Sequence, residues 1–463
     1  MSPWALVAAA ALFVLLGLLG SRFAGVLASP ADSALYRAVI YTLAGAVLLH
    51  LVLTVLDFAG VRWSLPLLAV ALALIAGAAH RFLPRGSVTR LPTDLGWGDG
   101  LALFALVAFT VLALTGWIAM PDFLYHWGLK GHRFYLAHGV DYAFLTRSWN
   151  WGVHPEYPNL VPEMFAVTAM LAGAFDVPAM MLGTVALFAL LLAAVREGLR
   201  QGGVDRFTLQ AGVAMVALIT AAFGIGYVMA GAADWNLALA LAAAVPPLLR
   251  PPDRTGDFQI GDFQIGIIAA FAAASKVEGV PLAVFLVAAQ IVRRIASRPR
   301  SAFRLSLITA LRAGLLPAVV ILPWLIQAVR LHLFQSFNSG AFEPARAGVI
   351  FKAVAAALWT PAWHGLLPAM FLPPLLLLPR RTRTFAAVAT LELLFYFYIY
   401  FTSGVGDYRY YVFSNFPRLG FQLIPACLVA ALMAWASPKE KRPTGSLPSA
   451  ARSDESAGVS AAG

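Results

Sequence analysis

The sequence has one cysteine and very little charge. Asp, Glu, Lys and Arg together make up 12% of its 463 residues, and Cys427 lies inside an apolar run. A single cysteine excludes a disulfide within the chain and disfavours a thiol-based metal site. So small a charged fraction, beside 60% hydrophobic residues, is far from that of soluble domains and indicates a polytopic membrane protein.

Acidic residues are scarcer than basic ones, 22 against 33, which gives a formal net charge of +11. In a soluble protein this balance would suggest nucleic-acid binding. In a membrane protein its commoner cause is arginine-rich loops on the cytoplasmic side, so we expect membrane lipids and no nucleic acid as partners. The N-terminus lacks positive charge ahead of its first apolar run, which predicts a retained helix rather than a cleaved signal peptide.

Apolar runs long enough to cross a bilayer recur along the chain. They predict an all-α polytopic membrane protein with about 13 transmembrane helices, in a range of about 11–14. The apolar run 158–174 contains Pro162 and Glu163, and we predict a re-entrant or interfacial helix there. The predicted spans are 3–20, 35–56, 62–80, 99–119, 176–196, 207–230, 235–249, 263–275, 279–294, 306–329, 364–379, 384–402 and 416–436.

The distribution of Lys and Arg predicts an N-terminus outside and a C-terminus inside the cytoplasmic membrane. If 158–174 crossed the membrane fully, the strongest basic loops would face outward, so the charge pattern favours the re-entrant interpretation. The tail 437–463, rich in Ser, Ala, Gly, Pro and charge, is predicted to be disordered. The basic loops expected inside are 81–90, 196–206, 293–304, 379–383 and 437–442.

The stretch "MPDFLYHWGLKGHRFYLAHG", 120–139, collects polar and aromatic residues directly after an apolar run. In an α-helix Asp122, His126, Lys130 and Arg133 would share one face, opposite aromatic residues. This pattern predicts an amphipathic helix in the membrane interface, with the lysine and arginine reaching for water or phosphate. A plain interfacial anchor is the alternative.

Asp122 stands at the mouth of the preceding span. A carboxylate there could accept a proton from an acceptor group as a general base, while an N-cap role is the alternative. The histidines at 126, 132 and 138 recur every six residues. That spacing lacks the i, i+4 pair of a helical zinc site, so we predict no metal.

The stretch "WNWGVHPEYPNLVPE", 149–163, contains three X-Pro steps that favour a rigid, extended backbone. His154, Glu156, Tyr157 and Glu163 form a polar cluster beside an apolar run. Two glutamates in such a place need partners, which favours a turn that faces a substrate. The alternative is a structured turn with residues of an aromatic belt.

Further charged residues stand at the predicted outer ends of spans. Asp234 opens one span, and Lys276 and Glu278 lie in "AAASKVEGVPLAV". Arg409 and Arg418 flank a tyrosine-rich stretch ahead of the last span. Cations in these places suit a lipid-linked phosphate. Alternatively, Lys276 pairs with one of the acids to lock helices together, and the arginines snorkel.

These segments, in this order, resemble the GT-C superfamily of membrane glycosyltransferases. The likeness is to bacterial, family 39-like relatives of protein mannosyltransferases and of lipid A aminoarabinose transferase. It covers about residues 120–425 and leaves the N-terminal helices, 1–98, and the tail outside. The motifs that carry it are Asp122 after a span, "HPEYPNLVPE", the Ala-Asp at 233–234, "KVEG" at 276–279 and "SNFPRLGFQLIP" at 414–425.

The resemblance implies an inverting transfer of a sugar from a polyprenyl-phosphate donor to a lipid, glycan or protein acceptor. The reaction would take place at the outer face of the bacterial inner membrane, in a module spanning 99–436 whose first outer loop is 120–159. Asp122 would take the acceptor's proton, and Lys276, with Arg418 or Arg409, would neutralise the departing phosphate.

The chain departs from the family pattern in one respect. Many relatives carry two acids in the first outer loop, whereas Asp122 has no adjacent partner. The departure leaves a divalent metal without support, so we expect no cofactor, and it makes Glu156 a substitute base.

Two other functions stay open. A transporter or flippase of a lipid-linked saccharide would place ionisable residues near the bilayer midplane, where this chain has few, Glu392 among them. A non-catalytic assembly subunit with the same fold is the other alternative, and the presence of Asp122 and Lys276 argues against it.

Overall fold

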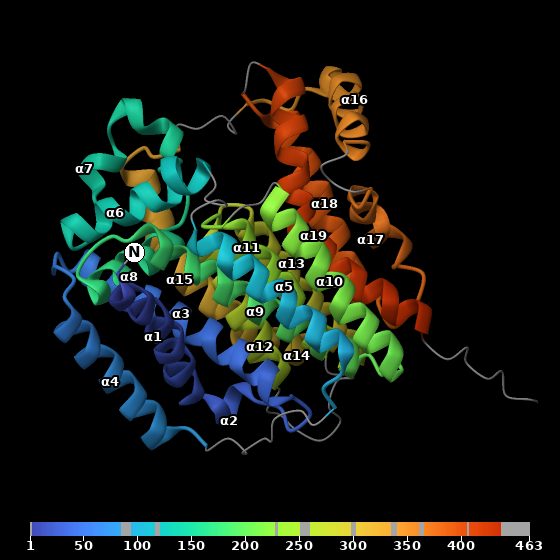
Figure 1. The fold of residues 1–463 in the computed structure, drawn as a ribbon, viewed down its shortest axis with the longest axis horizontal. Helices are drawn as coiled ribbons and strands as arrows, with labels where there is room; N and C mark the ends of the chain where they lie inside the picture. The colour runs from blue at the N-terminus through green and yellow to red at the C-terminus, as the bar shows by residue number, and fades with distance from the viewer. Residues whose placement is uncertain are drawn as a thin grey trace, which may run out of the picture.

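The computed structural model describes residues 2–84, 94–115, 121–226, 230–250, 260–297, 302–334, 340–360, 365–404 and 407–436. Helices form this part of the chain, which contains no β-strand (Figure 1). The predicted tail, 437–463, lies outside the described residues.

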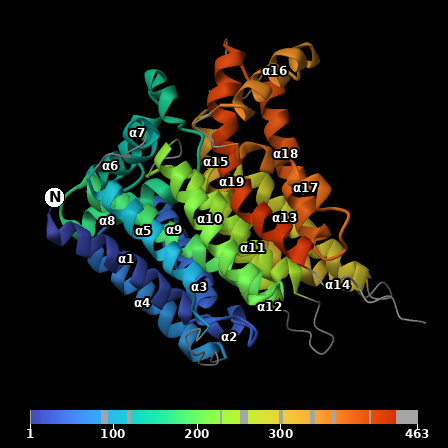
Figure 2. The ribbon, with the colours of Figure 1, turned by 45° about the vertical axis from the view of Figure 1, so that its right-hand side comes forward.

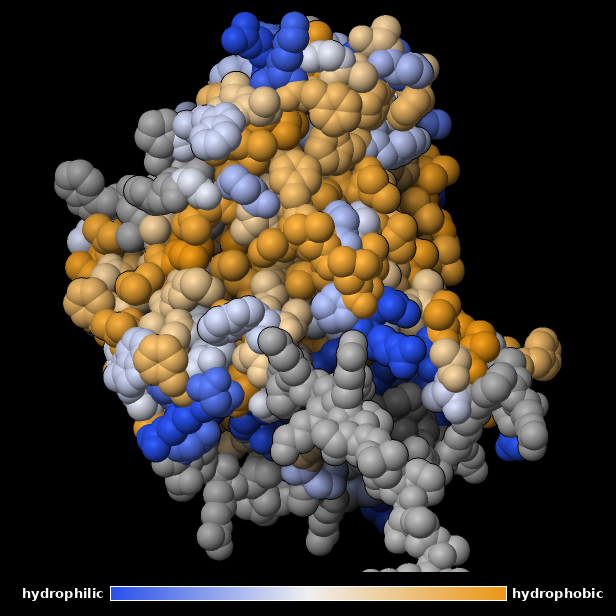
Figure 3. All heavy atoms as spheres, turned by 90° about the vertical axis from the view of Figure 1, so that its right-hand side faces the viewer, coloured by the Kyte–Doolittle hydropathy of each residue, from blue (hydrophilic) through white to orange (hydrophobic). Residues whose placement is uncertain are grey.

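Nine helices in the described part are long and apolar enough to cross a membrane. A broad apolar band runs round the face shown in Figure 3, between hydrophilic patches above and below. Both features are those of a polytopic membrane protein. The nine are α1 (Pro3–Ser21), α3 (Ala34–Phe58), α4 (Leu65–Phe82), α5 (Trp97–Leu114), α9 (Val177–Gln201), α13 (Gly279–Ser297), the helix Ser306–Arg330, α18 (Arg383–Thr402) and α19 (Tyr408–Ala436).

The remaining helices lie outside this set of nine. Three of them, α10 (Arg206–Gly226), α11 (Asp234–Leu249) and α12 (Ile260–Ser275), match predicted spans. The helix Ser306–Arg330 joins the end of α14 (Ala302–Thr309), a π-turn η4 (Ala310–Gly314) and α15 (Leu315–Arg330). The others are α2 (Ala24–Leu27), η1 (Phe123–Trp127), α6 (Gly128–Ala137), α7 (Tyr142–Leu145), η2 (Ser148–Val153), α8 (Leu160–Ala172), η5 (Pro344–Arg346), α16 (Ala347–Leu358), η7 (Leu367–Phe371) and α17 (Leu372–Leu375).

One predicted span, 364–379, is wrong as a helix. Its described part contains only the 3₁₀ segment η7 and the single turn α17. Four prolines in this stretch remove backbone donors and break a continuous ladder. The stretch still leads toward the opposite end of the bundle, because Arg381, just beyond it, donates to the carbonyl of Gln201 at the end of α9.

Helix α8 covers the run predicted as re-entrant or interfacial. Its 13 residues span only about 20 Å, too little for the hydrocarbon core. Its C-terminal Gly173 accepts a hydrogen bond from Tyr135 of α6, and the next helix begins at once. Asp176 caps that helix and also accepts from the backbone of Ser2. The C-terminal end of α8 therefore lies at the same end of the bundle as α6 and the start of α1.

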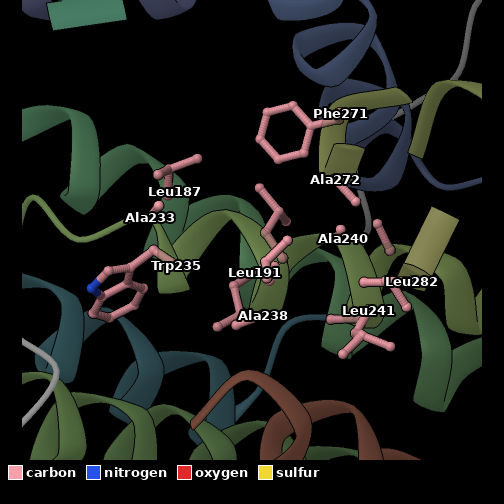
Figure 4. Packing of buried hydrophobic residues seen from close by; sticks show 14 of the residues in the cluster. Leu187, Leu191, Ala233, Trp235, Ala238, Ala240, Leu241, Phe271, Ala272 and Leu282 are labelled. Atoms are coloured by element: carbon pink, nitrogen blue, oxygen red, sulfur yellow. The ribbon is translucent and has the colours of Figure 1, made fainter. Parts of the chain in front are cut away.

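Helix α11 is the centre of the bundle. It is buried along nearly its whole length and packs on α9, α12 and α19. Figure 4 shows Trp235, Ala238 and Leu241 of α11 among leucines of α9 and residues of α12 and α13. Its alanines let neighbouring backbones approach closely, which is how helices associate where lipid removes the hydrophobic driving force. This rigid centre begins at Asp234, the residue that anchors the polar site.

The N-terminal helices are part of the same bundle. Helix α1 packs on α3, α8 and α9, and α3 also packs on α12. Two glycines permit the α1–α3 contact: a Cβ on Gly20 would lie 1.9 Å from the Tyr41 carbonyl oxygen, and one on Gly45 would lie 2.1 Å from that of Leu16. The N-terminal helices therefore support the later helices directly.

The bundle has two distinct ends. The end that carries α6, α7 and α16 in Figures 1 and 2 is called the site end. There Asp57, near the end of α3, accepts hydrogen bonds from the backbone of Val140 and the hydroxyl of Tyr142. The opposite, far end holds the start of α3, where the backbone of Ser33 donates to Glu197 of α9.

Candidate active site

The segment after α5 opens with a π-turn rather than a regular α-helix. In η1 the backbone N–H of Gly128 bonds to the carbonyl of Phe123, five residues back. A π-turn rotates the following residues away from the positions that α-helical spacing predicts. The predicted common face of Asp122, His126, Lys130 and Arg133 is therefore wrong, although Asp122 and His126 still lie together.

Asp122 is held beside Arg418, which comes from α19 at the other end of the sequence. The guanidinium of Arg418 forms an ion pair with Asp122 and donates to Oδ2 of Asp234 at 3.0 Å. One guanidinium nitrogen, Nη2, thus pairs with both carboxylates. Asp122 remains 18% exposed, whereas Asp234 is fully buried.

Lys276 completes the cluster. Its Nζ lies 3.2 Å from Oδ1 of Asp234 and 3.0 Å from Oε1 of Glu278. Burial alone would lower the pKa of Lys276, but the two carboxylates outweigh it and the pKa is raised. The structure therefore brings together Asp122, Asp234, Lys276, Glu278 and Arg418 from four separate segments. The sequence left open whether Lys276 binds phosphate or pairs with an acid to lock helices together. Its ion pair with Asp234 is part of this cluster.

Two residues that fix the position of Asp234, Gln422 and Tyr396, were not predicted from the sequence. Gln422 donates to Oδ1 of Asp234 at 2.5 Å, and the hydroxyl of Tyr396 donates to the side-chain oxygen of Gln422 at 2.5 Å. Gln422 lies one helical turn after Arg418, so the i, i+4 relation within the last span would have found it. Nothing in the sequence pairs Tyr396 with this site.

A cavity of ≈ 270 Å³ opens onto the cluster. Four charged side chains line it, two acids (Asp122 and Glu278) and two cations (Lys276 and Arg418). Asp234 does not line it and acts as an anchor behind the cations. Rings and uncharged polar groups form much of the remaining wall: Trp127, His126, His154, Tyr157, Tyr400, Tyr410, Tyr411, Ser414 and Asn415.

The turn 149–163 contributes two of these rings. His154 stacks on Tyr157 with ring centroids 4.6 Å apart and an angle of 18°. His154 has a positive φ of 51°, a conformation that costs energy outside glycine and clusters at functional sites. Glu156 hydrogen-bonds His154 but is buried and does not line the cavity, so it is poorly placed as the predicted substitute base.

Lys130 does not reach water or phosphate, contrary to the prediction. Its side chain is 0% exposed. The ammonium donates to the carbonyl of His154 at 3.1 Å and lies over the rings of Trp127 and Tyr157, at 5.0 and 5.9 Å from their centroids. Burial lowers the pKa of Lys130 to about 7, against the opposing effect of Glu156.

Three other predicted residues take positions apart from the cavity. Arg133 pairs with Asp141 and packs over the ring of Phe144. Arg409 is exposed near the start of α19 and is absent from the cavity wall. Glu163, on α8, forms a buried pair with His50 of α3, with 2.6 Å between Oε2 and Nδ1. Arg133 and Glu163 therefore hold the segments around the site, and Arg409 takes no part in the cavity.

His126 stands between the cluster and the turn. Its Nε2 lies 3.8 Å from Oδ1 of Asp122, and its ring centroid lies 4.9 Å from that of His154. Burial lowers the pKa of His126 to about 4, even though Asp122 raises it. The imidazole is therefore neutral at physiological pH.

The arrangement has a clear chemical capacity. A partly exposed carboxylate stands beside two cations, in a hollow with aromatic walls at one end of an apolar bundle. It can deprotonate a hydroxyl or amine, neutralise a phosphate and stack against a sugar ring. Within the described residues no group of three or more His, Cys, Asp and Glu side chains could hold a metal ion. Comparison of the chain with protein-family models, curated proteins and solved structures finds no match.

Proposed function

We propose that the chain is an inverting membrane glycosyltransferase. It moves a sugar from a polyprenyl-phosphate donor to a lipid, glycan or protein acceptor, with the site end on the outer side of the bacterial inner membrane. Asp122 is the general base, and Lys276 and Arg418 hold the phosphate. No metal or cofactor takes part in this mechanism.

One observation carries the proposal: Asp122, Lys276 and Arg418 line a single cavity although they come from distant parts of the sequence. The acid and the cations are the two kinds of group that glycosyl transfer from a phosphate needs. Apolar Ile399 and Leu419 line the same cavity and suit a prenyl chain entering from lipid. The tyrosine rings suit the apolar face of a sugar.

The ion pair between Asp122 and Arg418 suggests how substrate activates the base. When the donor phosphate takes over Arg418, the carboxylate of Asp122 is freed from its ion pair and can accept a hydrogen bond from the acceptor. Phosphate binding and activation of the base are then one event.

The transfer forms one bond to the sugar and breaks another. The acceptor oxygen forms a bond to the anomeric carbon while its proton moves to Asp122. The bond from that carbon to the phosphate oxygen breaks, and the polyprenyl phosphate leaves with the electron pair. Its charge grows by one unit, and Lys276 and Arg418 stabilise this growing charge in a site largely shielded from water.

The test uses the full chain in lipid nanodiscs with a panel of polyprenyl-phosphate sugars, each labelled in the phosphate, and a set of lipid, glycan and peptide acceptors. We expect release of polyprenyl phosphate with at least one donor. Asp122→Asn should lower that rate by about 10²–10⁴-fold, the usual contribution of a general base. The same substitution at Asp205, which caps α10 at the far end, should leave the rate unchanged.

Two results would overturn the proposal. One is an unchanged rate in Asp122→Asn, which would remove the base. The other is no transfer with any donor while the labelled polyprenyl phosphate itself fails to bind. The folded state of each variant is checked by its elution profile and thermal unfolding.

The orientation has its own test. Thr146 is exposed at the site end and Ser297 is exposed near the end of α13 at the far end. With buried Cys427 replaced by alanine, Thr146→Cys should react with an impermeant maleimide added to intact spheroplasts, and Ser297→Cys should not. The reverse pattern would place the site in the cytoplasm.

One observation favours transport of a lipid-linked saccharide as a second candidate. Glu392 lies within α18 and is fully buried. Buried acids inside spans often belong to transport pathways. In liposomes, a transporter would move the labelled donor between leaflets without breaking its sugar–phosphate bond, and Glu392→Gln would stop that movement.

A further inference from the structure

A groove lies in the half of the bundle toward the far end, between α2, α3, α12 and the segment η4–α15. Its volume is ≈ 560 Å³, against ≈ 270 Å³ for the cavity at the site end. Apolar side chains form most of its wall, and among the described residues that line it Arg312 alone is charged. The proposed sugar transfer makes no use of this far-end groove.

Contacts of α12 fix the depth of Arg312 in the bundle. Gln264 of α12 donates to the carbonyl of Leu27 and to the carboxylate of Asp32, which precedes the start of α3 at the far end. Two residues along α12, Gly266 lies against η4, because a Cβ on it would come within 3.0 Å of the Arg312 carbonyl oxygen. The backbone of Arg312 therefore lies only about 3 Å deeper than Gln264.

The apolar wall continues from Arg312 toward the middle of the bundle. Leu315 and Val319 follow Arg312 along the chain and line the same groove. Helix α3 contributes Val47 and Leu48, which lie near the midpoint of that helix. The far-end groove therefore has a cation near the end of the bundle and an apolar interior, the same order of groups as in a phospholipid.

We propose that the far-end groove binds one anionic phospholipid, with its phosphate on Arg312 and an acyl chain along α15 and α3. Arg312 lies inside the candidate span Ser306–Arg330, where ionisable side chains are costly and usually serve a function. A guanidinium has five N–H donors, so it can hold a phosphate beside any contact it makes with the protein. Basic pockets between membrane helices are known to bind anionic lipid headgroups.

The site goes beyond the proposed transferase and does not depend on it. Leu315 is 58% and Val319 45% exposed, so an acyl chain in the groove would cover apolar surface on α15 and join it to α3. A lipid that binds only the folded protein raises the free energy of unfolding. Binding should therefore be measurable as stability as well as retention.

The test uses the full chain in detergent, with phosphatidylglycerol as the anionic probe and phosphatidylcholine with the same acyl chains as the zwitterionic one. In native mass spectrometry the wild type should retain one phosphatidylglycerol about tenfold more tightly than phosphatidylcholine, the effect of a charge-assisted hydrogen bond. Arg312→Gln should lose this preference. Added phosphatidylglycerol should raise the unfolding temperature of the wild type more than that of Arg312→Gln.

A second variant and a control separate the charge from the groove. Val319→Trp places an indole in the groove from an exposed position, so it should weaken retention of both lipids while the protein stays folded. Arg304 is exposed on α14 and does not line the groove. Arg304→Gln removes the same charge from the same segment and should retain phosphatidylglycerol as the wild type does.

Three results would overturn the proposal. One is equal retention of the two lipids by the wild type, and another is wild-type affinity for phosphatidylglycerol in Arg312→Gln. The third is displacement of phosphatidylglycerol from the wild type by an equimolar polyprenyl phosphate, which would assign the groove to a carrier lipid instead.

Discussion

Buried charged clusters lie at both ends of the bundle, and they differ in what surrounds them. At the far end Asp32 accepts hydrogen bonds from Arg250, Gln264, Gln201 and the backbone of Ser29. That carboxylate is only 1% exposed. At the site end Asp122 has a comparable arginine partner, yet it lines a cavity and is 18% exposed.

The difference shows that an ion pair alone does not separate structure from function. At the far end, amide and guanidinium groups donate hydrogen bonds to the Asp32 carboxylate from several sides, as a buried carboxylate needs for stability. The site-end groups share fewer partners, and one arginine serves two acids. What sets the site apart is charge that faces a hollow, so that a ligand can replace one of the partners.

The largest difference between the two ends should appear when the same Asp→Asn substitution is made at each. Asp32→Asn should lower the free energy of unfolding by about 3 kcal/mol, because Arg250 and its neighbours lose a buried charged partner. Its turnover per folded molecule should stay normal. Asp122→Asn should show the reverse, a folded protein without transfer. The measurements are thermal unfolding in detergent and phosphate release by the folded fraction.

Asp205→Asn is the control for the far end, because asparagine caps a helix about as well as aspartate. Equal loss of stability in Asp32→Asn and Asp205→Asn would show that the far-end cluster has no special role. Loss of turnover in folded Asp32→Asn would show that the two ends are coupled.

Much of this division was predictable from sequence. Apolar run lengths and the distribution of arginines grouped Asp122, Lys276 and Arg418 at the same predicted membrane face, and the structure places them in one cavity. Run length also sufficed to separate α8 from the long helices. These inferences depend on averages over many residues, which tolerate local irregularity.

The local geometry was not predictable in the same way. The π-turn at 123–127 rotates the later residues of the helix away from the faces that α-helical spacing predicts. Nothing in the sequence of this segment indicates the extra residue in the turn. Lys130 and Arg133 consequently left the predicted face. The break of 364–379 was more accessible, because its four prolines are visible in the sequence and oppose a continuous helix.

The second prediction concerns Lys130, which is buried at the site end and does not line the cavity. Its pKa is about 7 in the folded protein, against about 10.4 in an unfolded chain. Between these values the unfolded state binds more protons, so stability rises with pH, and below pH 7 the burial cost is complete. Relative to Lys130→Met, the wild type should therefore gain about 2 kcal/mol between pH 7 and 9.

The measurement is thermal unfolding of both proteins across that pH range. Lys352, exposed on α16, gives the control, because Lys352→Met should shift stability equally at each pH. A parallel course for wild type and Lys130→Met would show that Lys130 is fully charged in the folded protein throughout.

The third prediction sharpens the role of the shared arginine. In Arg418→Lys the charge remains, but an ammonium lacks the planar set of N–H donors with which a guanidinium holds a phosphate in bidentate fashion. We expect kcat/KM for the donor to fall about tenfold, equivalent to about 1.4 kcal/mol. Arg409→Lys, on the exposed start of the same helix, should leave kcat/KM unchanged. Equal effects of the two substitutions would reject the assignment of Arg418 to the phosphate.

The smallest effect is expected at Arg133. This residue tests whether a cation at the site end matters when it does not line the cavity. Arg133 is 38% exposed and pairs with Asp141 rather than with the cavity. A pair so accessible to water contributes little, so Arg133→Gln should cost at most about 0.5 kcal/mol of stability and leave kcat/KM unchanged. Phosphate release and thermal unfolding measured together decide the point. If Arg133→Gln slowed transfer as much as Arg418→Lys, a cation anywhere on this end would be enough, and the cavity would not define the site.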